Sequence, residues 1–115
     1  MQTDEIRTLV LNAVEELKAV NVRVLDVREQ TSMTDVFVIA GGTSARHVKA
    51  IAHNVTMKAK AAGMEILGVE GEGQGEWVLV DLGDVVAHVM LPQVREFYQL
   101  ERLWESGPAP QRASA

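Results

Sequence analysis

Residues 77–90 read WVLVDLGDVVAHVM and carry the clearest fold signal in the chain. Two valine-rich runs flank the pair Leu82-Gly83, so we predict a β-hairpin with a tight turn at this pair. Because the strands of a hairpin are antiparallel, this turn also predicts which residues face each other across it. The predicted pairs are Asp81 with Asp84, Leu79 with Val86, and Trp77 with His88.

The two faces of the predicted hairpin differ in chemistry, because successive side chains of a strand point to opposite sides. One face is purely aliphatic and is expected to lie under helices. It consists of Val78, Val80, Leu82, Val85, Ala87 and Val89. The opposite face is large and amphipathic, and it consists of Trp77, Leu79, Val86, His88 and Met90, with Asp81 and Asp84 at the turn.

The amphipathic face allows two interpretations. It can be a second packing layer with Trp77 as a core aromatic, or it can be an exposed surface where another protein docks. Tryptophan, tyrosine and methionine are enriched at the centres of protein interfaces. We favour the docking surface, since the three helices expected in this chain can cover one face of a five-stranded sheet but scarcely both.

The remaining chain alternates helices and strands, which indicates the α/β class. A strand-helix-strand unit is normally parallel and a hairpin is antiparallel, so we predict a mixed five-stranded sheet layered with helices. One domain is expected at residues 1–104, followed by a disordered tail at 105–115. The predicted elements are a helix from Thr3 to Asn21, interior strands at 22–27 and 36–40, a helix capped by Thr43 or Ser44 and ended by Gly63, a strand at 66–69, the hairpin, and a helix with Pro92 in its first turn.

The overall composition is that of an ordinary globular protein. With 115 residues, of which 47% are hydrophobic and 23% charged, the chain suits one domain with a substantial core. It has no cysteine, which excludes disulfides and thiolate metal sites. No apolar run approaches the roughly 20 residues that span a bilayer, and the N-terminus carries acids where a secretory signal carries bases. We therefore expect a cytoplasmic protein with no membrane partner.

The acidic balance of the second half of the chain favours a basic protein as partner. The net charge is −5, and residues 65–105 hold nine acidic and two basic side chains. Such a half repels phosphate, so nucleic-acid binding there is disfavoured. The second predicted helix carries a basic stripe opposite its apolar face, which we interpret as a solvated surface rather than an anion-binding one. The stripe consists of Arg46, Lys49, His53 and Lys60.

The turn Gly41-Gly42-Thr43-Ser44 is the strongest candidate for enzyme chemistry, because glycines at a helix N-terminus let backbone amides approach a phosphate. It lacks the lysine of a P-loop, and residues 51–58 lack the acidic pair with which a nucleotidyltransferase holds magnesium. Asp81 and Asp84 fit turn chemistry better than catalysis. We predict no catalytic, cofactor or metal residues. The alternative is a nucleotide-binding or nucleotidyltransferase-type enzyme that uses this turn.

Four blocks of sequence together resemble the ribosomal silencing factor family, also called Iojap-like proteins, along nearly all of residues 4–104. The blocks are TDVFVIAGGTSARHVKAIA, GVEG, WVLVDLGDVVAHVM and REFYQLERLW. The resemblance implies a nucleotidyltransferase-like α/β fold without the catalytic acids. It also implies binding to large-subunit ribosomal protein fourteen, at the surface where the small subunit would dock, and repression of translation when nutrients are short. Gly41 departs from the many members that place serine or threonine there.

The resemblance also implies which residues meet the ribosomal partner. Trp77, His88 and the block around Tyr98 fall where the family contacts that protein. With the rest of the amphipathic face, the expected partner-binding residues are Trp77, Leu79, Val86, His88, Met90 and Tyr98. In the complex the basic residues Arg46, Lys49 and Lys60 are candidates to face ribosomal RNA. An apolar surface left free in solution also favours a homodimer through the same face.

Overall fold

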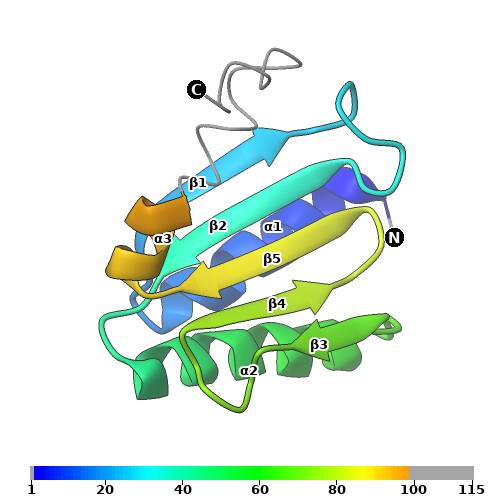
Figure 1. Ribbon diagram of the computed structural model, residues 1–115. Coiled ribbons are helices and arrows are strands. Elements are labelled where there is room, and N and C mark those ends of the chain that lie inside the picture. Colours follow the sequence, from blue (N-terminus) through cyan, green and yellow to red (C-terminus); the bar gives the residue numbers. More distant parts are fainter. Residues whose placement is uncertain (1, 99–115) are drawn as a thin grey trace.

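The described part of the protein, residues 2–98, is a mixed five-stranded sheet with two helices on one face, shown by the computed structural model in Figure 1. Of Phe97 and Tyr98 only the backbone is described. The α/β class and the mixed sheet are confirmed. The helices are α1 (Thr3–Glu16), α2 (Ala45–Ala61) and α3 (Pro92–Tyr98), and the strands are β1 (Val20–Asp26), β2 (Val36–Gly41), β3 (Gly68–Glu70), β4 (Trp77–Asp81) and β5 (Val85–Met90).

The strands lie in the order β1-β2-β5-β4-β3. The central strands β2 and β5 are parallel, and the other three neighbouring pairs are antiparallel. It follows that β2 and β3, which flank α2 in the chain, run in the same direction, as predicted for a strand-helix-strand unit. They are not neighbours, because the hairpin of β4 and β5 lies between them.

The turn of this hairpin lies one residue later than predicted. The amide of Leu82 donates to the carbonyl of Val85 at 2.9 Å, so the two-residue turn is Gly83-Asp84 rather than Leu82-Gly83. Gly83 has a φ of +90°, a conformation that favours glycine. The partner strand is shifted by two residues, an even number, so both faces stay as predicted. The observed pairs include Trp77 with Met90, Leu79 with His88, and Asp81 with Val86.

The aliphatic face of the hairpin lies under α1 and α2, as predicted. Each of its side chains is buried in the main core, and burial of one such side chain stabilises the fold by about 1.5–3 kcal/mol. We call this side of the sheet the inner face. The helices contribute Ile6, Val10, Ala13 and Val14 from α1, and Val48, Ile51, Ala52, Val55 and Ala59 from α2.

The first predicted strand is not interior. β1 is an edge strand that pairs only with β2, and Val24 on it is 38% exposed. β-branched residues are common in both edge strands and central strands. Their presence in residues 22–27 therefore could not show which kind of strand this segment forms. The register of β1 also shifts between Val20 and Arg23, where Asn21 has a positive φ of 52°.

Two predicted limits of α1 are also wrong. The amide of Gln2, before the helix, donates to Glu5 at 2.8 Å, whereas Thr3 is already helical and lies with its hydroxyl 3.3 Å from a carboxylate oxygen of Asp35. The helix ends at Glu16 rather than at Asn21, because residues 20–26 are used by β1.

For α2, the predicted cap Ser44 is confirmed, since its hydroxyl accepts the amide of His47 at 3.1 Å.

The residues between β3 and β4 form a closed turn that depends on glycine. The amide of Gly75 donates to the carbonyl of Gly71 at 3.1 Å, and both glycines have positive φ angles, +74° and +90°. A Cβ atom on Gly71 would collide with the carbonyl oxygen of Trp77. The start of β4 is therefore held by a backbone contact that only glycine permits.

We expect Gly71→Ala to lower the free energy of unfolding by about 2 kcal/mol or more, since the new methyl group meets both an unfavourable φ and a backbone collision. Gly73→Ala is the matched control, because Gly73 has open space around its Cβ position and no positive φ. Urea unfolding of the two variants measures the difference. Equal stability of the two would contradict this account of the turn.

Candidate functional site

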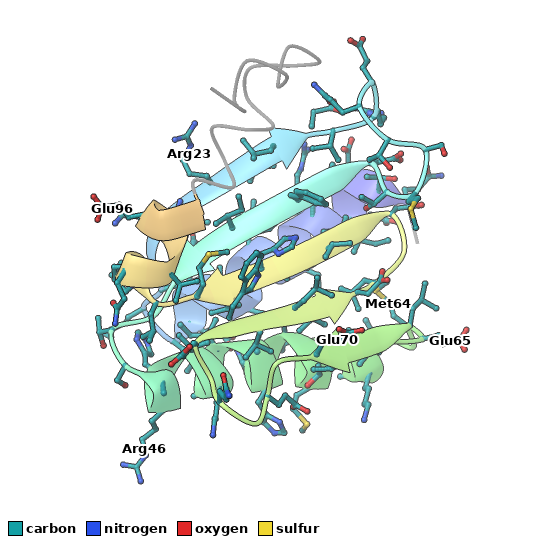
Figure 2. All side chains as sticks on the ribbon, viewed as in Figure 1. Arg23, Arg46, Met64, Glu65, Glu70 and Glu96 are labelled. Carbon is teal, nitrogen blue, oxygen red and sulfur yellow. The ribbon has the colours of Figure 1, made fainter. Side chains whose placement is uncertain are left out.

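The sheet face opposite α1 and α2, here called the outer face, gathers the predicted partner-binding residues. Trp77 and Leu79 come from β4, and Val86, His88 and Met90 come from β5. Figure 2 views this face, with the side chains of β2, β5 and β4 pointing toward the reader and Glu70 on β3 at its margin. Phe37 of β2 pairs with Val86 and joins the same face, although sequence reasoning did not single it out.

One end of the outer face is covered by α3, which corrects the expected role of Met90. Its side chain is 0% exposed and packs with Leu25, Val27 and Ile39 in a second, smaller core, against which Val94 of α3 also packs. Met90 therefore lies between the sheet and α3 and is not exposed to a partner in this structure. The hairpin pattern gave no sign of this, because the cover comes from a helix that follows in the chain.

The joint between β5 and α3 is a single residue, Leu91. Its amide donates to the carbonyl of Glu76 at 3.0 Å. Its own carbonyl accepts the amides of Val94 at 3.1 Å and Arg95 at 3.0 Å. Figure 1 shows α3 in front of the sheet, where β2 and β5 end and β1 begins, so that it forms a ridge beside the open part of the outer face.

The open part of the outer face consists of Trp77, Leu79 and Phe37, which are all partly exposed, together with Val86 at 8% exposure. Neither α1 nor α2 covers Trp77, because both helices pack on the inner face. Tyr98 belongs to α3, but its side chain lies outside the described residues. The geometry thus leaves a partly exposed aromatic and aliphatic surface, of the kind found at the centres of protein interfaces.

Trp77 and His88 are joined by a hydrogen bond. The indole Nε1–H donates to Nδ1 of His88 at 3.1 Å, and Phe37 packs edge to face on the same imidazole with ring centroids 4.7 Å apart. His88 is 5% exposed, and this burial lowers its pKa to about 4. The ring is therefore neutral near pH 7. Because Nδ1 accepts, the proton is assigned to Nε2, which finds no hydrogen-bond partner among the described residues.

The lowered pKa of His88 predicts a loss of stability in mild acid. The pKa of His88 is about 6.5 in the unfolded chain and about 4 in the folded protein. Between these two pH values the imidazole binds a proton in the unfolded state but not in the folded state, so acid favours unfolding. We expect the free energy of unfolding to fall by about 2 kcal/mol between about pH 7 and about pH 5. Urea titrations at the two pH values measure this change.

His88→Gln is the control for this pH effect, because glutamine can still accept the indole N–H but does not titrate. The difference in pH dependence between the wild type and this variant isolates His88 from the carboxylates, which also titrate in acid. Identical pH dependence of the two proteins would show that His88 is not the group responsible.

The basic stripe lies on the side of α2 away from the sheet. Arg46, Lys49 and Lys60 are all exposed, and Arg46 points outward from the start of the helix (Figure 2). Arg46 is therefore turned away from the outer face, whereas the side chain of Lys49 reaches Gly75, in the turn that leads into β4.

Two backbone amides of the glycine turn between β2 and α2 already have partners within the protein. The amide of Gly42 donates to the carbonyl of Met90 at 3.1 Å, and the amide of Thr43 donates to Nδ1 of His47 at 2.9 Å. A phosphate cradle requires such amides to be free. Gly42 is instead needed for packing, since a Cβ atom there would lie 2.7 Å from the side chain of Val48.

His47 is the residue at this turn that sequence reasoning missed. Its Nε2 lies 2.7 Å from the carbonyl oxygen of Leu17 at the end of α1, while Nδ1 receives the amide of Thr43. One imidazole thus satisfies an orphan carbonyl of α1 and an orphan amide near α2. The only available signal was its position three residues after the cap Ser44, since Leu17 is 30 residues away.

We expect His47→Ala to destabilise the fold by about 1–3 kcal/mol, because two backbone groups lose their partner. His53→Ala is the matched control, since His53 lies exposed on the same helix. Thermal unfolding compares the two variants. A loss of the same size in both would mean that the two contacts of His47 contribute nothing specific.

Comparisons with known proteins identify relatives along nearly the whole chain. A family model described as "Ribosomal silencing factor during starvation" matches residues 1–114. The protein named "Ribosomal silencing factor RsfS" from Chromobacterium violaceum is 48% identical over 104 residues, which cover 90% of this chain and 85% of that protein. A crystal structure of a protein from Chromobacterium violaceum superposes with a TM-score of 0.90 at 48% identity and covers 91% of this chain and 88% of that one.

A more distant relative comes from mouse. The protein named "Mitochondrial assembly of ribosomal large subunit protein 1" is 34% identical over 99 residues. The match covers 84% of this chain but 43% of the mouse protein. The shared region is therefore one part of a longer protein there.

Proposed function

The chain belongs to the ribosomal silencing factor family, and we propose that it represses translation under nutrient limitation by binding the large ribosomal subunit with its outer face. The observation that carries this proposal is the partly exposed surface of Trp77, Leu79 and Phe37 on a sheet whose other face is covered by helices. A surface of this composition suits a protein partner. The proposed role requires no catalysis.

The proposed partner is large-subunit ribosomal protein fourteen, as the sequence resemblance implies. Two observations support a partner on the large subunit. The name of the mouse relative refers to assembly of that subunit. The half of the chain that contains the outer face is strongly acidic, which favours a basic protein over bare phosphate.

The proposed mechanism is steric. A rigid domain bound at the surface where the small subunit docks prevents the two subunits from joining, and the degree of repression follows the fraction of large subunits occupied. A standard interface of about 1,600 Å² is sufficient for such a complex. Because ribosomes are the target, we place the action in the cytoplasm.

The outer face also suggests how the free protein behaves. We propose that two copies associate through the same surface when no ribosome is available, because an exposed apolar surface tends to self-associate. The dimer and the ribosomal complex then exclude each other. On the ribosome, the basic stripe of α2 would be turned away from the protein contact and toward ribosomal RNA.

The nucleotide-using alternative depends on the backbone amides at the turn of residues 41–44. The amides of Gly42 and Thr43 already have partners within the protein. A nucleotide would have to break these bonds to bind there. We therefore favour the docking role over a nucleotide-using enzyme.

We expect Trp77→Ala to weaken binding to purified large ribosomal subunits by about 30-fold or more, the effect of losing an interface hot spot of about 2 kcal/mol. Co-sedimentation with separated subunits measures this loss. The variant should remain folded but be less stable, since the hydrogen bond to His88 is lost. Leu79→Lys, which places a charge at the centre of the same surface, should also abolish binding.

Met57→Ala is the matched control for this experiment. Met57 is an exposed hydrophobic side chain on α2, away from the outer face. Its removal should leave co-sedimentation unchanged. Wild-type binding by both outer-face variants, or an equal loss in Met57→Ala, would refute the proposal that the outer face is the docking surface.

A further inference from the structure

A small pocket opens beside the indole of Trp77, where the glycine turn after β3 faces the ridge of α3. Its volume is about 290 Å³. This volume lies at the lower end of the roughly 300–1,000 Å³ of pockets that hold small-molecule ligands, and it is enough for one long side chain. The described residues that line it are Gly71, Gly73, Gln74, Glu76, Trp77 and Val94.

The walls of the pocket combine apolar and acidic chemistry. Trp77 and Val94 provide an aromatic and an aliphatic wall, and Glu76 provides a carboxylate. Glu76 is exposed, and none of the ion pairs found among the described residues involves it. Its backbone carbonyl is bonded to the amide of Leu91, which holds the residue in place while its side chain stays available.

The surroundings of the pocket are also acidic. Residues 70–76 read EGEGQGE and carry three glutamates and no base. Two bases lie nearby, Lys49 of α2, whose aliphatic stem lies beside Gly75, and Arg95, which follows Val94 on α3, but neither is among the described residues that line the pocket. A cationic group that enters the pocket therefore meets a negative field, whereas an anionic one is repelled.

We infer that this pocket receives an arginine side chain of the protein that docks on the outer face. The guanidinium group pairs with the carboxylate of Glu76 and lies against the indole of Trp77, while its methylene stem packs on Val94. Arginine fits this combination better than lysine, because its planar group stacks on aromatic rings and binds carboxylates with two hydrogen bonds. The inference rests on the proposed function, since it describes the partner of the same surface.

The first test compares two variants that lose the same charge. Glu76→Gln should weaken binding to isolated large-subunit ribosomal protein fourteen about tenfold, because the arginine loses its ionic partner. Glu72→Gln should change binding by no more than about twofold, since Glu72 lies in the same turn but does not line the pocket. Equal losses in the two variants would mean that only the general acidic field matters, and no loss in Glu76→Gln would likewise overturn the inference.

The second test uses a small probe and does not require the ribosome. N-acetyl-arginine amide at millimolar concentration should shift the NMR signals of the Trp77 indole N–H and the Gly73 amide. The uncharged analogue N-acetyl-citrulline amide should not shift them, and the arginine shifts should be lost in Glu76→Gln. Equal shifts with both probes, or none with arginine, would overturn the inference.

The two tests separate failure of the pocket from failure of the proposed function. If the wild-type protein binds large subunits and Glu76→Gln binds equally well, the outer face remains the docking surface and the arginine pocket is wrong. If the wild-type protein does not bind large subunits at all, the proposed function fails. The probe measurement then decides by itself whether the pocket recognises arginine.

Discussion

Burial of the valine-rich inner face under α1 and α2 is the constraint on which the rest of the structure depends. Side chains alternate along a strand, so placing Val78, Val80 and Ala87 in the core places Trp77 and Leu79 on the outer face. A slip of one residue would move the indole under the helices and the valines into solvent. Core packing on one side thus determines the chemistry that the other side presents.

The sequence predicted the faces of the hairpin correctly even though it misplaced the turn. The true pairing differs from the predicted one by two residues, and an even shift preserves which side each residue faces. Burial of Met90 and the edge position of β1 could not be predicted in the same way. Both depend on where distant elements pack, which local periodicity does not report.

The turn at residues 41–44 combines glycines at a helix N-terminus with hydrogen bonds that use two of its backbone amides. Glycines and a capped helix N-terminus are present, yet His47 and β5 already bind the amides of Thr43 and Gly42. Sequence reasoning disfavoured a nucleotidyltransferase site on a different ground, the missing acidic residues, and that expectation stays a prediction. The partner of His47, Leu17, could not have been foreseen, because the contact joins the ends of two helices. The likeness to nucleotidyltransferases stays a prediction, and fold by itself would not assign a reaction.

Leu91 joins β5 to α3 and also accepts and donates backbone hydrogen bonds that reach Glu76 and Arg95. Strand β5, which forms part of the outer face, and helix α3, which forms the ridge beside it, are therefore directly connected through Leu91 and its hydrogen bonds. These bonds restrict the backbone at this joint before any partner binds, so little of the entropic cost of association comes from ordering it. If relatives share this backbone arrangement of β5 and α3, differences in the lifetime of their complexes with the partner protein would arise from the side chains that β5 and α3 carry.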